Sequence, residues 1–317
     1  MRAVTIVDGR FELRQRPEPV LQPDQVLIGV RGAGLNAADL QQARGDYPAP
    51  VGWPADIPGL EVSGEILEVG SAVRDVRAGE RVMALVGGGA HAERIAVPAD
   101  LLLPVPDTLS WSQAGGFPEA FSTAWDALVT QACTTAGERV LITGAAGGIG
   151  TAMIQIAAIS GADVVASVRR TELHDKVASL VPENDRLAVV TPDGEADCGP
   201  FDVIVELVGG DDCLDRVQLL RTGGRVLVVG VQGGMTAPLK MFDLMLKRAR
   251  LIGTTIRGRS PAEKALLAHR LRTHVVPLLA QGRIQVPLEA TYPLQGYEDA
   301  YTRLSGPGKF GKIVLTP

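Results

Sequence analysis

The sequence predicts an α/β protein in which a doubly wound parallel sheet is combined with a second, β-rich unit. From about Thr123 onward, short runs of Val, Ile and Leu alternate with helical segments, the pattern of parallel strands covered by helices on both faces. A glycine-rich turn joins the first of these strands to its helix. About the first hundred residues instead hold β-branched runs ending at Gly or Pro, as in a small barrel or sandwich. The length of 317 residues fits two domains.

The elements expected in the first unit follow from these runs. A short helix over 37–45, closed by Gly45, interrupts the strands. The Pro-punctuated segment 101–118 is expected at the edge of the unit. The expected strands are 26–34, 61–70, 80–87 and 93–98.

The second unit is expected to alternate strands with helices. The strands are 139–144, 163–168, 187–190, 201–209, 225–230 and 250–255, and the helices are 150–161, 171–180 and 211–220. A long helix over 262–281 and a strand over 312–315 come last. No helix follows that strand, so we expect it to return to the first unit.

Composition excludes several classes of protein. The net charge of −5 and the 13 aromatic residues argue against a nucleic-acid or membrane-surface partner. Three cysteines without a C-x-x-C pair argue against a disulfide framework or zinc knuckle. Residues 140–162 carry no charged side chain, but their glycines and polar residues favour a strand, turn and buried helix over a membrane span. The N-terminus lacks the apolar run of a secretory signal, so a cytoplasmic protein is expected.

The turn between the first strand and helix of the second unit is a candidate phosphate site. It reads Gly144-Ala-Ala-Gly147-Gly148-Ile149-Gly150, a G-x-x-G-x-x-G spacing. Glycines let a backbone approach a pyrophosphate, which faces the unpaired N–H groups of the helix. Such turns also serve plain strand-to-helix packing. Its place inside a βαβ unit favours dinucleotide binding, with Gly147, Gly148 and Ile149 at the phosphates.

The end of the second strand predicts which dinucleotide is bound. An NAD site carries an acid there for the ribose 2′-hydroxyl, whereas this chain has Ser167-Val168-Arg169-Arg170 and no acid before Glu172. Guanidinium groups suit a 2′-phosphate, which favours NADPH with Ser167, Arg169 and Arg170 as contacts. The alternative is a solvated Arg pair. Val208, Gly230 and Val231 end later strands at the ligand-binding edge of the sheet.

Segments along nearly the whole chain resemble one known family. They are GLNAADLQQARGDYPAP (34–50), IPGLEVSGEILEVG (57–70), GERVMALVGGGAHAERIAVP (79–98), FPEAFSTAWDAL (117–128), GAAGGIG (144–150), FDVIVELVGG (201–210), GGRVLVVG (223–230), LMLKRARLIGTTIRGRS (244–260) and GKIVL (311–315). The chain resembles the zinc-free quinone oxidoreductase branch of the medium-chain dehydrogenase/reductase superfamily, closest to its p53-inducible subgroup.

This resemblance implies a domain arrangement. A GroES-like catalytic domain would comprise residues 1–122 and be completed by 256–317. A Rossmann domain over 123–255 would bind NADPH. A homodimer would form by pairing strand 250–255 with its mate.

The resemblance also carries implications for the site. Zinc-dependent relatives have ligands at positions matching Asn36, Leu60 and Glu119; since leucine cannot bind zinc, no metal is expected. Asn36 and Tyr47 would line the cleft beside the nicotinamide, with Tyr47 as donor to a developing oxyanion. Asp39 is expected to have a structural role, and the four histidines to pack or lie at the surface. Family positions that contact the cofactor match Thr123, Ile256, Arg257 and, more weakly, Lys312.

Two departures from the family and three functions follow. The family usually has a Lys where this chain has Leu173, and a Tyr near the adenosine phosphate is absent from 187–203. The first function is NADPH-dependent reduction of a quinone or other conjugated carbonyl, in which the cofactor supplies the chemistry. The second is reduction of an enone or enoyl thioester in a biosynthetic pathway. The third is a non-catalytic NADPH-binding protein.

Overall fold

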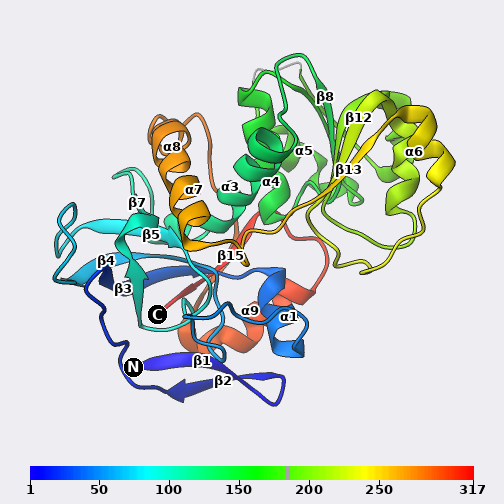
Figure 1. Ribbon diagram of the computed structural model, residues 1–317. Helices are drawn as coiled ribbons and strands as arrows, with labels where there is room; N and C mark the ends of the chain where they lie inside the picture. The colour runs from blue at the N-terminus through cyan, green and yellow to red at the C-terminus, as the bar shows by residue number, and fades with distance from the viewer. Residues whose placement is uncertain (183–185) are drawn as a thin grey trace. The chain divides into compact units, whose positions relative to one another are not determined.

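The computed structural model describes residues 1–182 and 186–317, which divide into two compact units. Unit 1 comprises Met1–Ser122 and Ile256–Pro317, coloured blue to cyan and orange to red in Figure 1. Unit 2 comprises Thr123–Thr255, coloured green to yellow. Both termini of the chain therefore belong to unit 1.

Unit 1 is built on a seven-stranded sheet in the order β14-β15-β3-β4-β5-β7, with β6 also paired to β3. Alternating apolar residues of β3 and β4, such as Val26, Ile28 and Ile66, are buried in its core. The strands are β3 (Gln25–Gly34), β4 (Glu61–Val69), β5 (Arg81–Leu85), β6 (Arg94–Pro98), β7 (Leu102–Pro104), β14 (Leu288–Pro293) and β15 (Lys312–Thr316). A separate hairpin joins β1 (Arg2–Val7) to β2 (Arg10–Gln15).

The last strand returns to the first unit, as the sequence predicts. β15 pairs antiparallel with β3, placing Val314 opposite Gly34 and Leu315 opposite Ala33. This pairing sets the start of β15 beside the segment that leads into α1 (Ala37–Arg44). The C-terminal strand thus brings Lys312 to Asn36, although 276 residues separate them.

The helices of unit 1 differ from expectation at one place. The predicted long helix 262–281 is wrong, because the structure has α7 (Pro261–His274) and α8 (Val276–Ala280) with a break at Val275. Pro277 has no N–H to continue the first helix, which explains the break. The other helices are α2 (Trp111–Gly115), α9 (Tyr297–Ser305) and α3 (Pro118–Trp125), which continues from unit 1 into unit 2.

Unit 2 is a parallel six-stranded sheet in the order β10-β9-β8-β11-β12-β13. Its strands are β8 (Arg139–Ile142), β9 (Asp163–Ser167), β10 (Leu187–Val190), β11 (Phe201–Glu206), β12 (Leu220–Val228) and β13 (Arg250–Gly253). Three α-helices are α4 (Gly148–Ile159), α5 (His174–Ala178) and α6 (Met241–Lys247). The strand order reverses at β8, where such folds bind ligands at the carboxyl ends of the strands.

Two predicted helices of unit 2 are shorter or of another type. Residues 211–220 form a 3-10 helix over Cys213–Leu219, because β12 already begins at Leu220 and leaves no room for further turns. Residues 171–180 form a 3-10 turn, Thr171–Leu173, followed by α5. The uncharged stretch 140–162 forms the strand, turn and buried helix expected of it. No helix within 1–182 or 186–317 is long and apolar enough to cross a membrane.

Candidate functional site

The glycine turn of unit 2 presents the start of α4 at the carboxyl edge of the sheet. Gly144 takes a left-handed backbone conformation, φ +59°, which turns the chain out of β8. Gly147 stands at the N-cap of α4, and no side chain caps the first turn. The first N–H groups of a helix have no intrahelical acceptor, so those of Gly148 and Ile149 can serve an anion.

Two glycines of this turn are required for different reasons. A Cβ on Gly150 would lie 2.6 Å from the backbone of Ala145, so packing of the turn against the helix demands glycine there. A Cβ on Gly147 would meet nothing of the protein closer than the Gly144 carbonyl oxygen at 3.5 Å. The fold therefore tolerates a side chain at Gly147, but a closely approaching phosphate would not. This open cradle fits the pyrophosphate of a dinucleotide.

The end of β9 carries the residues predicted to select the dinucleotide. Arg169 is exposed and has no hydrogen bond or ion pair with any residue that the structure describes. Arg170 bonds instead to Glu172 at 3.0 Å, and this contact lowers the pKa of the Glu172 carboxyl. Leu173, where the family has Lys, is buried and packs into the unit. Arg169 is the residue whose charge is available to a 2′-phosphate.

A buried acid that sequence reasoning missed reaches the end of β9. Ser167 donates to Glu195 Oε1 at 2.5 Å, and the Glu195 side chain is 5% exposed. Arg216 holds Glu195 through Nε at 2.7 Å and Nη2 at 3.1 Å. The acid is therefore neutralised by its own guanidinium. No local pattern could predict this contact, because Glu195 lies 28 residues after Ser167.

Arg216 also bonds to Glu206, the last residue of β11. Its Nη1 lies 3.1 Å from Glu206 Oε2, and both acids together raise the pKa of Arg216 against the effect of burial. Glu206 Oε1 accepts hydrogen bonds from Thr143 Oγ1 at 2.9 Å and from the N–H groups of Val208 and Gly209 at 2.7 and 2.9 Å. This Glu195–Arg216–Glu206 network therefore fixes the ends of three neighbouring strands, β8, β9 and β11.

The remaining candidates of unit 2 lie on the segments that follow β11 and β12. Val208 accepts a hydrogen bond from the N–H of Gly233 at 2.6 Å, which ties the two segments together. A Cβ on Gly230 would lie 2.4 Å from the Leu207 carbonyl oxygen, so this close approach needs glycine. Val231 is half-buried beside them, and Thr123 is buried on α3.

In unit 1, Asn36 belongs to a buried polar cluster. Its Oδ1 accepts from Lys312 Nζ at 2.6 Å, and its Nδ2 donates to Glu61 Oε1 at 3.1 Å. Lys312 also pairs with Glu61 at 2.5 Å and donates to the Leu35 carbonyl oxygen at 3.0 Å. The three hydrogens of the ammonium are thus matched by three acceptors within unit 1. Asp39 accepts from the N–H groups of Asn36 and Gly59, which confirms its structural role.

Tyr47 is held in unit 1 by Arg257. Arg257 Nη1 donates to the Tyr47 carbonyl oxygen at 2.7 Å, and the guanidinium lies 5.1 Å from the centre of the Tyr47 ring. Nε donates to the Gly87 carbonyl oxygen at 3.0 Å and Nη2 to Gln42 Oε1 at 2.5 Å. Arg257 and its neighbour Ile256 are both buried. The structure thus brings two predicted site residues, Tyr47 and Arg257, into contact.

Comparison with known proteins places these features in a family. The sequence matches the family described as "Alcohol dehydrogenase GroES-like domain" over residues 22–107 and "Zinc-binding dehydrogenase" over 148–271. Quinone oxidoreductase-like protein 2 of Bos taurus is 31% identical over 95% of this chain and 87% of its own length. The chain belongs to the quinone oxidoreductase branch of the medium-chain dehydrogenase/reductase superfamily.

Two further relatives of this oxidoreductase extend the comparison. The quinone oxidoreductase of Thermus thermophilus, whose structures include a complex with NADPH, is 31% identical with a TM-score of 0.86 and full coverage of both chains. A phenolphthiocerol/phthiocerol polyketide synthase of Mycobacterium tuberculosis is 31% identical over 93% of this chain, which spans 14% of that protein. The GroES-like and Rossmann-type domains expected from the sequence are confirmed.

The three positions that match zinc ligands of other superfamily members lie in unit 1 of this oxidoreductase. Asn36 is engaged by Lys312 and Glu61, and Leu60 is a buried hydrocarbon side chain. The N–H of Glu119 donates to Glu61 Oε2 at 2.9 Å. Among residues 1–182 and 186–317, no three His, Cys, Asp or Glu side chains gather as they would around a metal ion.

Proposed function

We propose that this protein is an NADPH-dependent reductase that transfers hydride to a quinone or another conjugated carbonyl compound without zinc. The cradle at Gly147 carries the proposal, because packing within the described protein does not demand glycine there and a bound pyrophosphate would. The similarity to a quinone oxidoreductase that binds NADPH supports it.

The residues of the chain would share the work as follows. NADPH, when bound, supplies a hydride from its nicotinamide to the conjugated acceptor. Gly147, Gly148 and Ile149 would bind the pyrophosphate through main-chain N–H groups, and Arg169 the 2′-phosphate. Tyr47 would donate a hydrogen bond to the acceptor oxygen as it gains charge. Arg257 would keep Tyr47 in place through the main-chain contact at 2.7 Å.

The direct test is NADPH oxidation by the purified protein against matched acceptors. The panel holds ortho- and para-quinones, small enones and enoyl thioesters, with NADH in parallel. Turnover of quinones supports the proposal. Tight NADPH binding without turnover of any acceptor would reject it and support a non-catalytic binding protein.

A second candidate is an enoyl-thioester reductase. The 31% identity to a segment of a polyketide synthase favours it, because such synthases carry their intermediates as thioesters. The same hydride geometry serves both acceptors. A kcat/KM for enoyl thioesters about tenfold or more above that for quinones would select this function.

The glycine turn gives a matched pair of variants. Gly147→Ala should fold as the parent does but bind NADPH about tenfold or more weakly, because its methyl group would occupy the phosphate cradle. Gly150→Ala should lower the free energy of unfolding by about 1–3 kcal/mol, because its methyl group meets the Ala145 backbone. Calorimetric NADPH titration and urea denaturation measure the two effects. Unchanged NADPH affinity in Gly147→Ala would remove the cradle argument.

Arg169 and Arg170 are proposed to select NADPH over NADH. Charge-assisted hydrogen bonds contribute about 1.5–3 kcal/mol, so the double variant Arg169→Glu, Arg170→Glu should lose about 10- to 100-fold of that preference. Dissociation constants of both cofactors give the preference directly. The exposed Arg283→Glu controls for the charge change. A double variant that still prefers NADPH would refute the assignment.

We also propose a homodimer formed through β13. This strand is at the edge of its sheet within the described chain, and an unpaired edge can pair with a second copy. Large exposed apolar side chains gather on α6 and β13: Met241, Phe242, Met245, Leu246 and Leu251. Sedimentation of the parent and of Leu251→Lys should separate dimer from monomer.

A further inference from the structure

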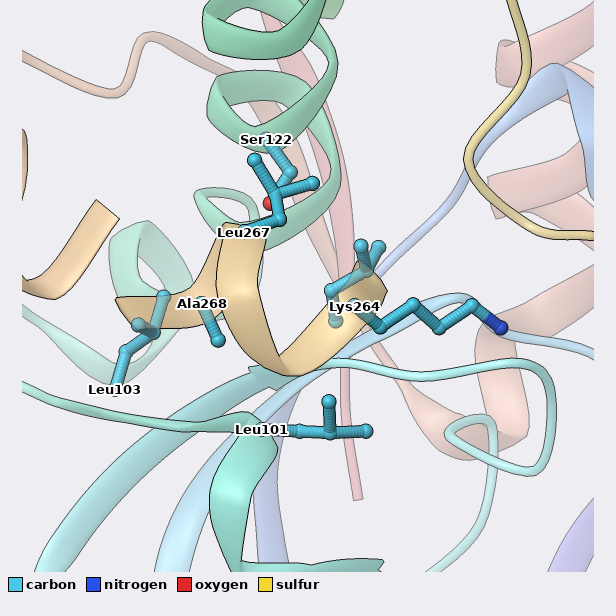
Figure 2. A pocket seen from close by; sticks show the side chains of 7 residues that line it. Leu101, Leu103, Ser122, Lys264, Leu267 and Ala268 are labelled. Atoms are coloured by element: carbon cyan, nitrogen blue, oxygen red, sulfur yellow. The ribbon is translucent and has the colours of Figure 1, made fainter. Parts of the chain in front are cut away.

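Lys264 of α7 is a buried cation without a partner. Its side chain is 7% exposed, and its ammonium makes no hydrogen bond or ion pair with any residue that the structure describes. Figure 2 shows its hydrocarbon stem beside Leu101 and its nitrogen extending away from Leu267 and Ala268. These residues line a cavity of about 10 Å³, roughly the space of one water molecule. Burying a charge without a partner is unfavourable, so the position calls for an explanation.

A second buried cation lies near Lys264. The positive charge of Arg257, together with burial, lowers the pKa of the Lys264 ammonium. Arg257 uses three of its five N–H groups on the neutral oxygens of Gly87, Tyr47 and Gln42. Asp39 acts on Arg257 from a distance, but its oxygens are occupied by main-chain N–H groups. Two positive charges therefore lie close together in unit 1 with no carboxylate bonded to either.

We propose that Lys264 and Arg257 bind a carboxylate carried by the acceptor that this protein reduces. The ammonium offers three N–H groups and the guanidinium two more, enough to satisfy both oxygens of a carboxylate. Arg257 also contacts Tyr47, the proposed donor to the acceptor carbonyl, so the cations adjoin that residue. The substrate class is then a conjugated carbonyl compound with an acidic group. This assignment rests on the proposed reductase function, whereas anion binding itself does not.

Binding of a small carboxylate tests the site without any turnover. Benzoate and its neutral counterpart benzyl alcohol are titrated calorimetrically into the full-length protein, into Lys264→Met and into the exposed control Lys176→Met. Benzoate should bind the parent and the control alike and Lys264→Met about 10- to 100-fold more weakly, while benzyl alcohol should not discriminate. Equal benzoate affinity in all three would overturn the proposal. Inorganic phosphate binding in place of benzoate would also overturn the choice of a carboxylate.

Stability and cofactor affinity distinguish this role from two others. Lys264→Met should keep or raise the Tm, because it removes an unpaired buried charge and retains the stem. A clear fall in Tm would assign Lys264 to packing. NADPH affinity should not change, and a tenfold loss would assign the two cations to the cofactor.

Turnover then tests the substrate class. A carboxymethyl-substituted benzoquinone should exceed its methyl ester in kcat/KM about tenfold or more with the parent, and Lys264→Met should lose this preference while still reducing the ester. Equal turnover of acid and ester by the parent would overturn the assignment. Reduction of neither compound would reject the reductase function, and the benzoate titration would still decide whether the anion site exists.

Discussion

Replacing Arg216 with methionine should lower the free energy of unfolding by about 3–5 kcal/mol, because it leaves two buried carboxylates without their cation. Glu195 is 5% exposed and Glu206 is fully buried, and Arg216 is bonded to both. Urea denaturation measures the loss, and hydrogen exchange should show weaker protection in β9 and β11. NADPH binding should weaken as well, since Glu206 positions the N–H groups of Val208 and Gly209.

Two further variants separate this effect from simple loss of packing. Arg221→Met removes a half-exposed guanidinium that lies 3.7 Å from Asp202, so it should change stability by less than about 1 kcal/mol. Adding Glu195→Gln and Glu206→Gln to Arg216→Met should restore more than half of the loss, because no buried charge remains. A single Arg216→Met variant within about 1 kcal/mol of the parent would contradict the argument.

Lys312→Met should have a similarly large effect in unit 1. Glu61 is fully buried, and its only ion pair within the described chain is with Lys312 at 2.5 Å. Removing the ammonium leaves this carboxylate uncompensated, at about 3–5 kcal/mol. Urea denaturation of Lys312→Met is compared with Lys309→Met, which removes a half-buried lysine without an ion pair to any described residue.

The double variant Lys312→Met, Glu61→Gln tells a structural role from a cofactor contact. It should recover most of the stability, because no buried charge is left unpaired. If NADPH affinity returns with it, Lys312 acts by holding Asn36 and Glu61. If stability returns and affinity does not, Lys312 touches the cofactor, as the resemblance implies. A Lys312→Met variant as stable as the parent would contradict the proposed importance of the ion pair.

Features that depend on neighbouring residues were predictable from the sequence. The apolar runs of β8, β9 and β11 mark buried parallel strands, because burial on both faces requires nearly continuous hydrocarbon side chains. Asp39 lies one helical turn after Asn36, so a capping contact follows from local geometry. Gly45 closes α1 at φ +84°, a conformation that glycine adopts at little cost. The order of elements and the place of the glycine turn follow from such patterns.

Features that join distant parts of the chain were decided by the tertiary structure. Glu195 reaches Ser167 from the segment after β10, and Lys312 reaches Asn36 from the last strand. The isolation of Lys264 from any described acid is likewise a property of the surrounding packing and not of its own helix. A sequence lists charges without stating which of them meet. Periodicity reports the burial and hydrogen bonding of adjacent residues, whereas the pairing of buried charges depends on the path of the whole chain.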